Sequence, residues 1–160
     1  MDEVAHQFLT FEISGLEVGI GIREVEQIVE YVAPTPVPHL PPAIRGVINL
    51  RGRVVPVVDL ALKLGLAPRP ASKRACIIVV ETLEAGVLGL AADSVKGLID
   101  VGDEGPLPLP DFGLPVKTEY LRGLAKGAEK LILLIDSVRV LSPAELLATA
   151  EGLSARAEAG

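Results

Sequence analysis

The amino-acid sequence repeats itself, and this repeat is the feature that most limits how the chain can fold. Residues 19–28 match residues 89–98 at an offset of 70, with a glycine first and apolar residues at the same places. Two Arg-Gly pairs, at 45–46 and 122–123, each precede an aspartate by thirteen positions counted from the glycine. A proline-rich crossing also occurs in each copy. We therefore expect two similar structural units.

Strand signals dominate the sequence of each copy. Short β-branched runs are separated by Gly, Pro, Asp and Asn, and few stretches are long enough for a helix. A copy of about 70 residues with about five short strands is too small to bury much surface alone. The two copies should therefore pack together as paired small barrels, which predicts an all-β fold.

Local capping signals mark the few helical segments. Asp59 and Asp136 are expected to cap short helical turns at 60–64 and 137–141, because a carboxylate accepts hydrogen bonds from free backbone N–H groups. Their duplication favours capping over catalysis. Ser142-Pro-Ala-Glu145 is a capping box with proline at the first helical position, and it predicts a helix at the end of the chain.

Charge and composition exclude several classes of protein. The net charge is −6, and residues 76–160 carry the whole deficit, so a nucleic-acid phosphate backbone is not the expected ligand. No apolar run has the roughly 18 residues that a membrane span needs, and the start lacks a hydrophobic signal core, so export is not expected. The single cysteine, Cys76, heads an apolar strand pattern and is expected to be buried.

Motifs for chemistry are scarce. The two histidines have no ligand-spaced partner, and neither a phosphate-binding glycine loop nor a Gly-x-Ser-x-Gly elbow occurs, so no metal or cofactor is expected. Aromatic residues make up 3% and tryptophan is absent, which argues against a polyproline groove. Two alternatives stay open beside a surface-binding adaptor. One is a stand-alone SH3-like peptide-binding module, and the other is a small hydrolase that uses Asp93 or Asp59.

A basic hairpin at residues 44–59 is the most distinctive local feature. Arg45, Asn49 and Arg51 share one parity and therefore one face of the strands, and residues 31–58 contain no acidic residue. Planar donors without a local partner suit a protein that presents carboxylates. Gly46 leaves a notch on the apolar face, which indicates either a bulge or the close approach of another element.

Residues 46–60, Gly-Val-Ile-Asn-Leu-Arg-Gly-Arg-Val-Val-Pro-Val-Val-Asp-Leu, resemble the signature segment of the CheW-like family of chemotaxis coupling proteins. Residues 25–28, 89–93 and 131–136 fall where that family has further conserved elements. The resemblance spans about residues 6–148 and implies two SH3-like five-stranded barrels related by internal duplication, plus a C-terminal helix.

The division within this CheW-like domain is expected as follows. The first barrel covers about 15–75 and the second about 76–141, with the strand 6–13 a candidate for sharing between them. The helix and tail occupy 142–160.

The resemblance also implies a cytoplasmic, non-catalytic adaptor, recruited to membrane-associated receptor arrays. It would bridge the cytoplasmic tip of a chemoreceptor to the regulatory domain of a CheA-type histidine kinase, and other CheW-like domains are further candidate partners. Two residues depart from the family pattern, Gln27 in place of glutamate and Ala92 in place of valine. A lost contact charge would alter partner preference. The residues expected to bind partners are Val25, Gln27, Gly46, Asn49, Arg51, Gly89 and Asp93.

Overall fold

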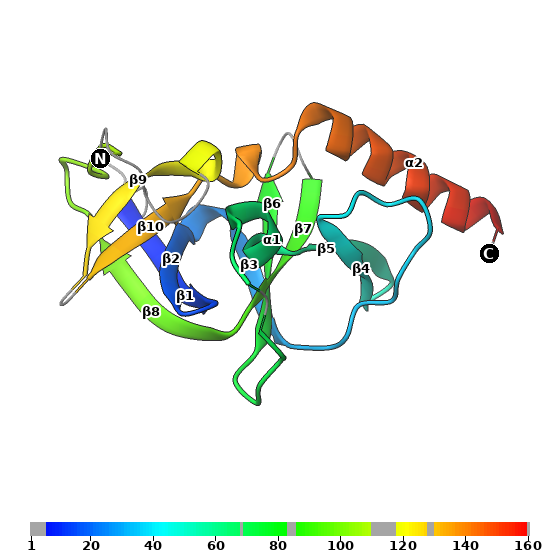
Figure 1. Cartoon of the computed structure of the whole chain (residues 1–160), viewed down its shortest axis with the longest axis horizontal. Coiled ribbons are helices and arrows are strands. Elements are labelled where there is room, and N and C mark those ends of the chain that lie inside the picture. The colour runs from blue at the N-terminus through cyan, green and yellow to red at the C-terminus, as the bar shows by residue number, and fades with distance from the viewer. Residues whose placement is uncertain (1–5, 68, 83–85, 110–117, 128–129, 160) are drawn as a thin grey trace.

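The computed structural model describes residues 6–67, 69–82, 86–109, 118–127 and 130–159. The described chain forms two five-stranded sheets and a C-terminal helix, as Figure 1 shows, so the predicted all-β fold with a final helix is confirmed. One sheet, which we call barrel A, has the strand order β8-β1-β2-β10-β9, and the other, barrel B, has the order β3-β6-β7-β5-β4. The strands are β1 (Gln7–Ile13), β2 (Leu16–Gly21), β3 (Val25–Glu30), β4 (Ile44–Leu50), β5 (Arg53–Val58), β6 (Cys76–Thr82), β7 (Gly86–Ala92), β8 (Ser94–Asp100), β9 (Leu121–Lys126) and β10 (Leu131–Ile135).

The two sequence repeats exchange strands between the barrels. Barrel A takes β1 and β2 from the first repeat and β8, β9 and β10 from the second, and barrel B takes the reciprocal set. In both barrels a parallel pairing joins the two repeats, through Val18↔Leu133 in barrel A and Val57↔Gly89 in barrel B. The predicted barrel boundaries, 15–75 and 76–141, are therefore wrong. Strand β1 belongs to barrel A, where it pairs with β2 and β8.

Two short crossings produce this exchange. The chain leaves barrel A after β2 through the 3-10 turn η2 (Ile22–Glu24) and enters barrel B as β3. It returns after β7 through Asp93 and enters barrel A as β8. Because each barrel needs strands from both repeats, neither repeat can complete its own barrel in this arrangement.

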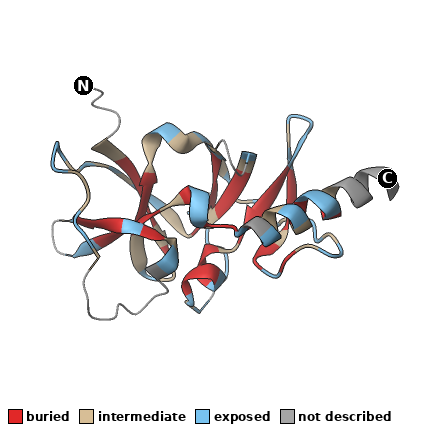
Figure 2. Ribbon diagram, turned by 90° about the horizontal axis from the view of Figure 1, so that it is seen from above, coloured by how far each residue is buried: buried red, intermediate tan, exposed pale blue. Residues whose placement is uncertain are grey.

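The largest apolar core lies between the barrels. Strands β1, β2, β6 and β7 turn one face toward this shared core, which includes Phe11, Val18, Ile20, Ile78 and Leu90, all fully buried. The opposite faces fill two much smaller interiors, one around Phe8 and Leu134 in barrel A and one around Val57, Ile77 and Val79 in barrel B. The buried strands of both sheets are visible in Figure 2. Shared burial confirms that the two units pack together, as their small size requires.

The proline-rich crossings close each barrel in the same way. Thr35 forms an isolated bridge to Val47 of β4, and Leu107 forms the equivalent bridge to Leu124 of β9. The backbone of Thr35 lies directly over Gly46, where a Cβ atom would be 2.7 Å from the Thr35 carbonyl carbon. The register of β4 against β5 also shifts between Ile44 and Gly46. Gly46 therefore lies both at a bulge and beneath a closely approaching element, and that element is a segment of this same chain.

The predicted caps are confirmed. The Asp59 carboxylate accepts a hydrogen bond from the Leu62 N–H at 3.1 Å and opens α1 (Leu60–Leu64). The Asp136 carboxylate accepts one from the Val138 N–H at 3.1 Å and opens the 3-10 turn η4 (Ser137–Arg139). Cys76 is buried, as predicted.

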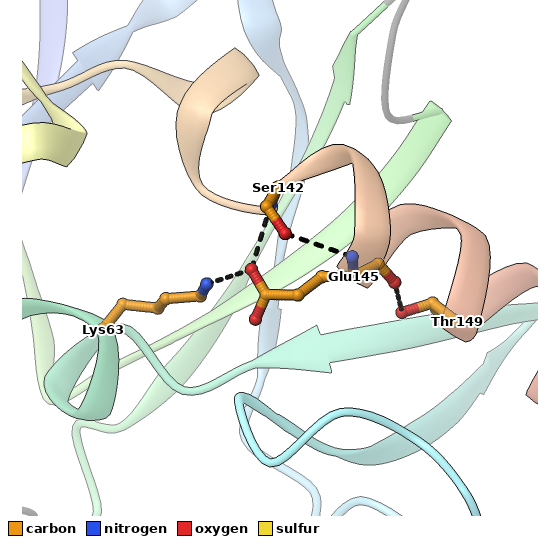
Figure 3. Close-up of polar contacts among 4 residues, drawn as sticks. All are labelled: Lys63, Ser142, Glu145 and Thr149. Atoms are coloured by element: carbon orange, nitrogen blue, oxygen red, sulfur yellow. Dashed lines mark hydrogen bonds and ion pairs between the residues drawn. The ribbon is translucent and has the colours of Figure 1, made fainter.

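Helix α2 (Pro143–Ala159) is anchored at its first turn (Figure 3). The Ser142 hydroxyl accepts a hydrogen bond from the Glu145 N–H at 3.1 Å, and the Glu145 carboxylate accepts one from the Ser142 N–H at 2.9 Å, which confirms the capping box. Glu145 also pairs with Lys63 of α1, whose ammonium group lies 5.1 Å from the centre of the Tyr120 ring. Burial raises the pKa of the Glu145 carboxyl, but hydrogen bonds from Lys63 and Ser142 outweigh it, and the pKa lies below its ordinary value.

Candidate functional site

The tip of the β4–β5 hairpin is a rigid two-residue turn. Leu50 pairs with Arg53, and the two residues between them, Arg51 and Gly52, both have positive φ, at 51° and 85°. This is the backbone pattern of a type I′ hairpin turn. The Asn49 side-chain carbonyl accepts a hydrogen bond from the Gly52 N–H at 2.9 Å. Asn49 therefore holds the turn that presents Arg51 to solvent.

Of the three arginines in this hairpin, two are already paired. The Arg45 guanidinium lies 3.1 Å from the Asp59 carboxylate, and Arg53 donates to Glu26 of β3, with one N–O distance of 3.3 Å. Arg51 is exposed and forms no ion pair with any described residue. The expectation that the planar donors of the hairpin lack a partner therefore holds only for Arg51, because folding brings Asp59 and Glu26, which lie outside residues 31–58, to Arg45 and Arg53. Arg51 alone stays open.

The two ion pairs also favour the charged forms of the side chains that form them. Burial lowers the pKa of Arg45, but the hydrogen bond and the charge of Asp59 outweigh burial and raise it. The hydrogen bond from Arg53 lowers the pKa of the Glu26 carboxyl. The Arg53–Glu26 pair also joins the hairpin to β3, which carries two other residues predicted to bind partners, Val25 and Gln27.

Strand β3 forms one edge of its sheet and is only partly covered. Val25 and Gln27 are half-buried, and the Gln27 amide donates to the Glu26 carboxylate at 3.4 Å. Ile28 of the same strand is 44% exposed, and Leu98, its counterpart in the repeat, is 58% exposed on the edge strand β8. Neither Ile28 nor Leu98 is identified as a candidate binding residue from the sequence. The signal in the sequence is an apolar residue retained at the same position of both copies, whereas the edge position of the two strands is visible only in the structure.

Gly46 and Gly89 are buried, and Asp93 is half-buried in the crossing between β7 and β8. Gly46 is buried beneath Thr35, and Gly89 is buried in β7, where a Cβ would be 2.8 Å from the Ile77 Cγ2 atom. The Asp93 carboxylate accepts a hydrogen bond from the Ser14 N–H at 2.7 Å and so ties the second crossing to the β1–β2 turn. The structure thus gives each of these three residues a role in the fold.

Two further observations concern function. Among the side chains that the structure describes, no group of three His, Cys, Asp or Glu residues is arranged to hold a metal ion. Within the same described ranges, no helix has both the length and the apolar character to cross a membrane.

The fold and the site together define a double-barrel protein that presents polar and apolar groups on rigid strands and turns. A family model described as the CheW-like domain matches residues 7–145. The chain is 32% identical to the chemotaxis protein CheW of Klebsiella aerogenes over 91% of this chain and 87% of that protein. It is 32% identical to protein FrzA of Myxococcus xanthus, over 90% of each.

The same likeness holds in three dimensions. The crystal structure of the scaffolding protein TtCheW from Thermoanaerobacter tengcongensis superposes with a TM-score of 0.79 at 30% identity and covers 88% of this chain and 90% of that one. The chain therefore belongs to the CheW-like family of chemotaxis scaffold proteins.

Proposed function

We propose that this chain is a non-catalytic adaptor that couples the cytoplasmic tip of a chemoreceptor to the regulatory domain of a CheA-type histidine kinase. It would act in the cytoplasm, recruited to membrane-associated receptor arrays. The observation that carries the proposal is Arg51, an open guanidinium on a rigid turn in a member of the CheW-like family. Because the turn fixes the backbone of Arg51, binding has to order only its side chain, and the guanidinium can form a bidentate pair with a partner carboxylate.

Apolar edge strands support a second contact in the same scheme. Exposed apolar side chains on edge strands mark interaction surfaces, because an uncovered edge is otherwise prone to aggregation. Ile28 on β3 and Leu98 on β8 fit the apolar face of an amphipathic receptor helix. The half-buried Val25 and Gln27 lie on the same strand as Ile28, so Gln27 in place of the family's glutamate would tune partner preference there.

The two carboxylates that a hydrolase would use already have partners in the fold. Asp59 caps α1 and pairs with Arg45, and Asp93 holds the Ser14 N–H. Their positions favour structural roles and leave the adaptor as the function with the most support.

Isothermal titration of Arg51→Glu with the purified kinase regulatory domain and with a receptor-tip fragment tests the proposal. We expect the affinity for at least one partner to fall by about 1–3 kcal/mol, with unchanged circular dichroism, because an exposed turn residue buries little surface. Lys130→Glu is the matched control, since Lys130 is exposed beside the equivalent β9–β10 turn of barrel A. Unchanged affinity for both partners would remove Arg51 from the interface.

The apolar contact is tested separately. Ile28→Ser and Leu98→Ser should weaken binding of the receptor-tip fragment, and Leu147→Ser is the control, because Leu147 is 62% exposed on α2. Equal binding by all three variants would exclude β3 and β8 from the receptor contact.

A further inference from the structure

A second charged feature lies at the junction of the barrels, away from the hairpin tip. A cleft of about 240 Å³ is lined by Glu12 of β1, by residues of the segment 69–74 that precedes β6, and by the second crossing with the start of β8. Three cations line it, Arg69 and Arg74 from the segment and Lys96 from β8. The only carboxylates among the described lining residues are those of Glu12 and Asp93.

Both carboxylates are already used within the fold. Glu12 lies 3.2 Å from the Lys96 ammonium and 3.9 Å from the Arg69 guanidinium, and Asp93 accepts the Ser14 N–H. Arg74 is exposed and pairs with no carboxylate in the described part of the chain. The cleft therefore keeps an excess positive charge in a protein whose net charge is −6.

The segment that supplies Arg74 is held in place. The Ser14 hydroxyl donates to the Ala67 carbonyl at 2.6 Å, and the Arg69 guanidinium lies against Gly15, with Nη2 2.8 Å from the position that a Cβ would take. Nearer to Arg74, its N–H donates to the Ser72 hydroxyl at 3.2 Å. These contacts position the backbone near Arg74, so ordering on binding falls mainly on the Arg74 side chain.

The cleft also breaks the symmetry of the duplication. At the offset of 70 residues, Lys96 of β8 corresponds to Glu26 of β3, so equivalent edge strands carry opposite charges at this position. Glu26 is paired with Arg53, whereas Lys96 points its charge toward the Glu12 side of the cleft. Only the β8 edge thus contributes to a positive site.

We propose that this cleft binds a carboxylate-bearing segment of a protein partner. The Arg74 guanidinium pairs with one aspartate or glutamate side chain, and Lys96 and Arg69 add attraction at longer range. Glu12 and Asp93 offset two of the three cations, so the cleft keeps one excess positive charge, which a single carboxylate neutralises, whereas a phosphate or a nucleic-acid backbone brings more negative charge than the cleft can balance. This proposal does not depend on the identity of the kinase or the receptor.

The test is an amide chemical-shift titration of the full chain, at low ionic strength, with an acetylated and amidated hexapeptide that carries a single glutamate among serines. We expect saturable shifts confined to residues 69–74 and 93–96, weakening with added salt, and about five- to tenfold weaker binding to Arg74→Gln. Lys130→Gln, at the far turn of barrel A, should bind as the parent chain does. The same hexapeptide with glutamine in place of its glutamate (the glutamine peptide), inorganic phosphate and an oligothymidylate serve as the other probes.

Four outcomes would overturn the proposal. The first is the absence of saturable shifts at these amides with the glutamate peptide. The second is equal binding of the glutamine peptide, and the third is equal loss for Arg74→Gln and Lys130→Gln. The fourth is tighter binding of phosphate or the oligonucleotide, which would assign the cleft to another class of anion.

Discussion

Barrels A and B are built from the same parts, yet they present different surfaces. Gly46 and Gly123 both lie beneath a crossing backbone, and Gly19 and Gly89 both make room inside their own barrel. The exposed charges follow no such rule. Arg45 of barrel B pairs with Asp59, whereas its counterpart in barrel A, Arg122, lies 3.9 Å from Glu24 and 5.4 Å from the centre of the Phe8 ring.

Two further surface features belong to barrel B. The β4–β5 turn ends in an open arginine, and helix α2 runs along barrel B, close to β5 and β7 (Figure 1). Glycines that fix the backbone are thus shared by the two repeats, whereas these charged positions have diverged. A duplicated fold can in this way offer a different surface to each of two partners.

Substitution of the glycines that lie beneath the crossing segments should give the largest loss of stability. Gly46→Ala is expected to cost at least about 3 kcal/mol of unfolding free energy, because the added Cβ meets a backbone carbonyl and φ is +154°. Gly123→Ala should also destabilise, since a Cβ there lies 2.7 Å from the Leu107 carbonyl oxygen. Urea denaturation measures both. Gly52→Ala is the control with positive φ and open space, and a Gly46→Ala midpoint equal to the parent's would mean that the crossing can move.

The shared core should make the two barrels unfold together. Val18 of barrel A and Val58 of barrel B are fully buried in it, and we expect alanine at either position to cost about 2 kcal/mol. Amide hydrogen exchange should show a similar loss of protection in both barrels for either variant. Val54→Ala, at a half-exposed position of β5, should change little. Loss confined to the mutated barrel would show that the barrels unfold independently.

Helix α2 should depend on the charge of Glu145. Glu145→Gln is expected to cost about 1.5 kcal/mol through the weakened capping box and the lost Lys63 pair. Because the folded state lowers the Glu145 pKa, the stabilisation is complete above the ordinary value of 4.5 and is lost as the pH falls through the lower folded value. The difference between Glu145→Gln and the parent chain should therefore shrink in acid. Glu151→Gln, at an exposed position of α2, should show no such pH dependence.

The smallest expected loss of stability concerns the β4–β5 turn, with the equivalent position of the β9–β10 hairpin as the comparison. Asn49→Ala should cost about 0.5–1 kcal/mol, because the Gly52 N–H loses its acceptor at an exposed turn. Lys126, the equivalent residue of β9, is exposed, and Lys126→Ala should be nearly neutral. Exchange of the Gly52 amide reports the change directly. Unchanged exchange in Asn49→Ala would mean that backbone geometry alone holds the turn.

Local signals in the sequence predicted much of the fold. Alternating apolar residues indicate strands, and the carboxylates of Asp59, Asp136 and Glu145 are predictable as caps, because each acts within three residues of its own position. The offset of 70 residues correctly indicated a duplication. The Asn-Leu-Arg-Gly segment indicated the family, which the match over residues 7–145 confirms.

Long-range pairing could be read only from the tertiary structure. Nothing in residues 44–59 shows that Glu26 reaches Arg53, or that the backbone of Thr35 covers Gly46. The exchange of strands was hidden for the same reason, since either repeat supplies a chemically acceptable neighbour for β2 or β7. Periodicity and capping depend on residues a few positions apart, so the sequence alone determined which elements form and which family they belong to. The partner of each edge, arginine and glycine depends on how distant segments share one core, and only the folded chain decided that.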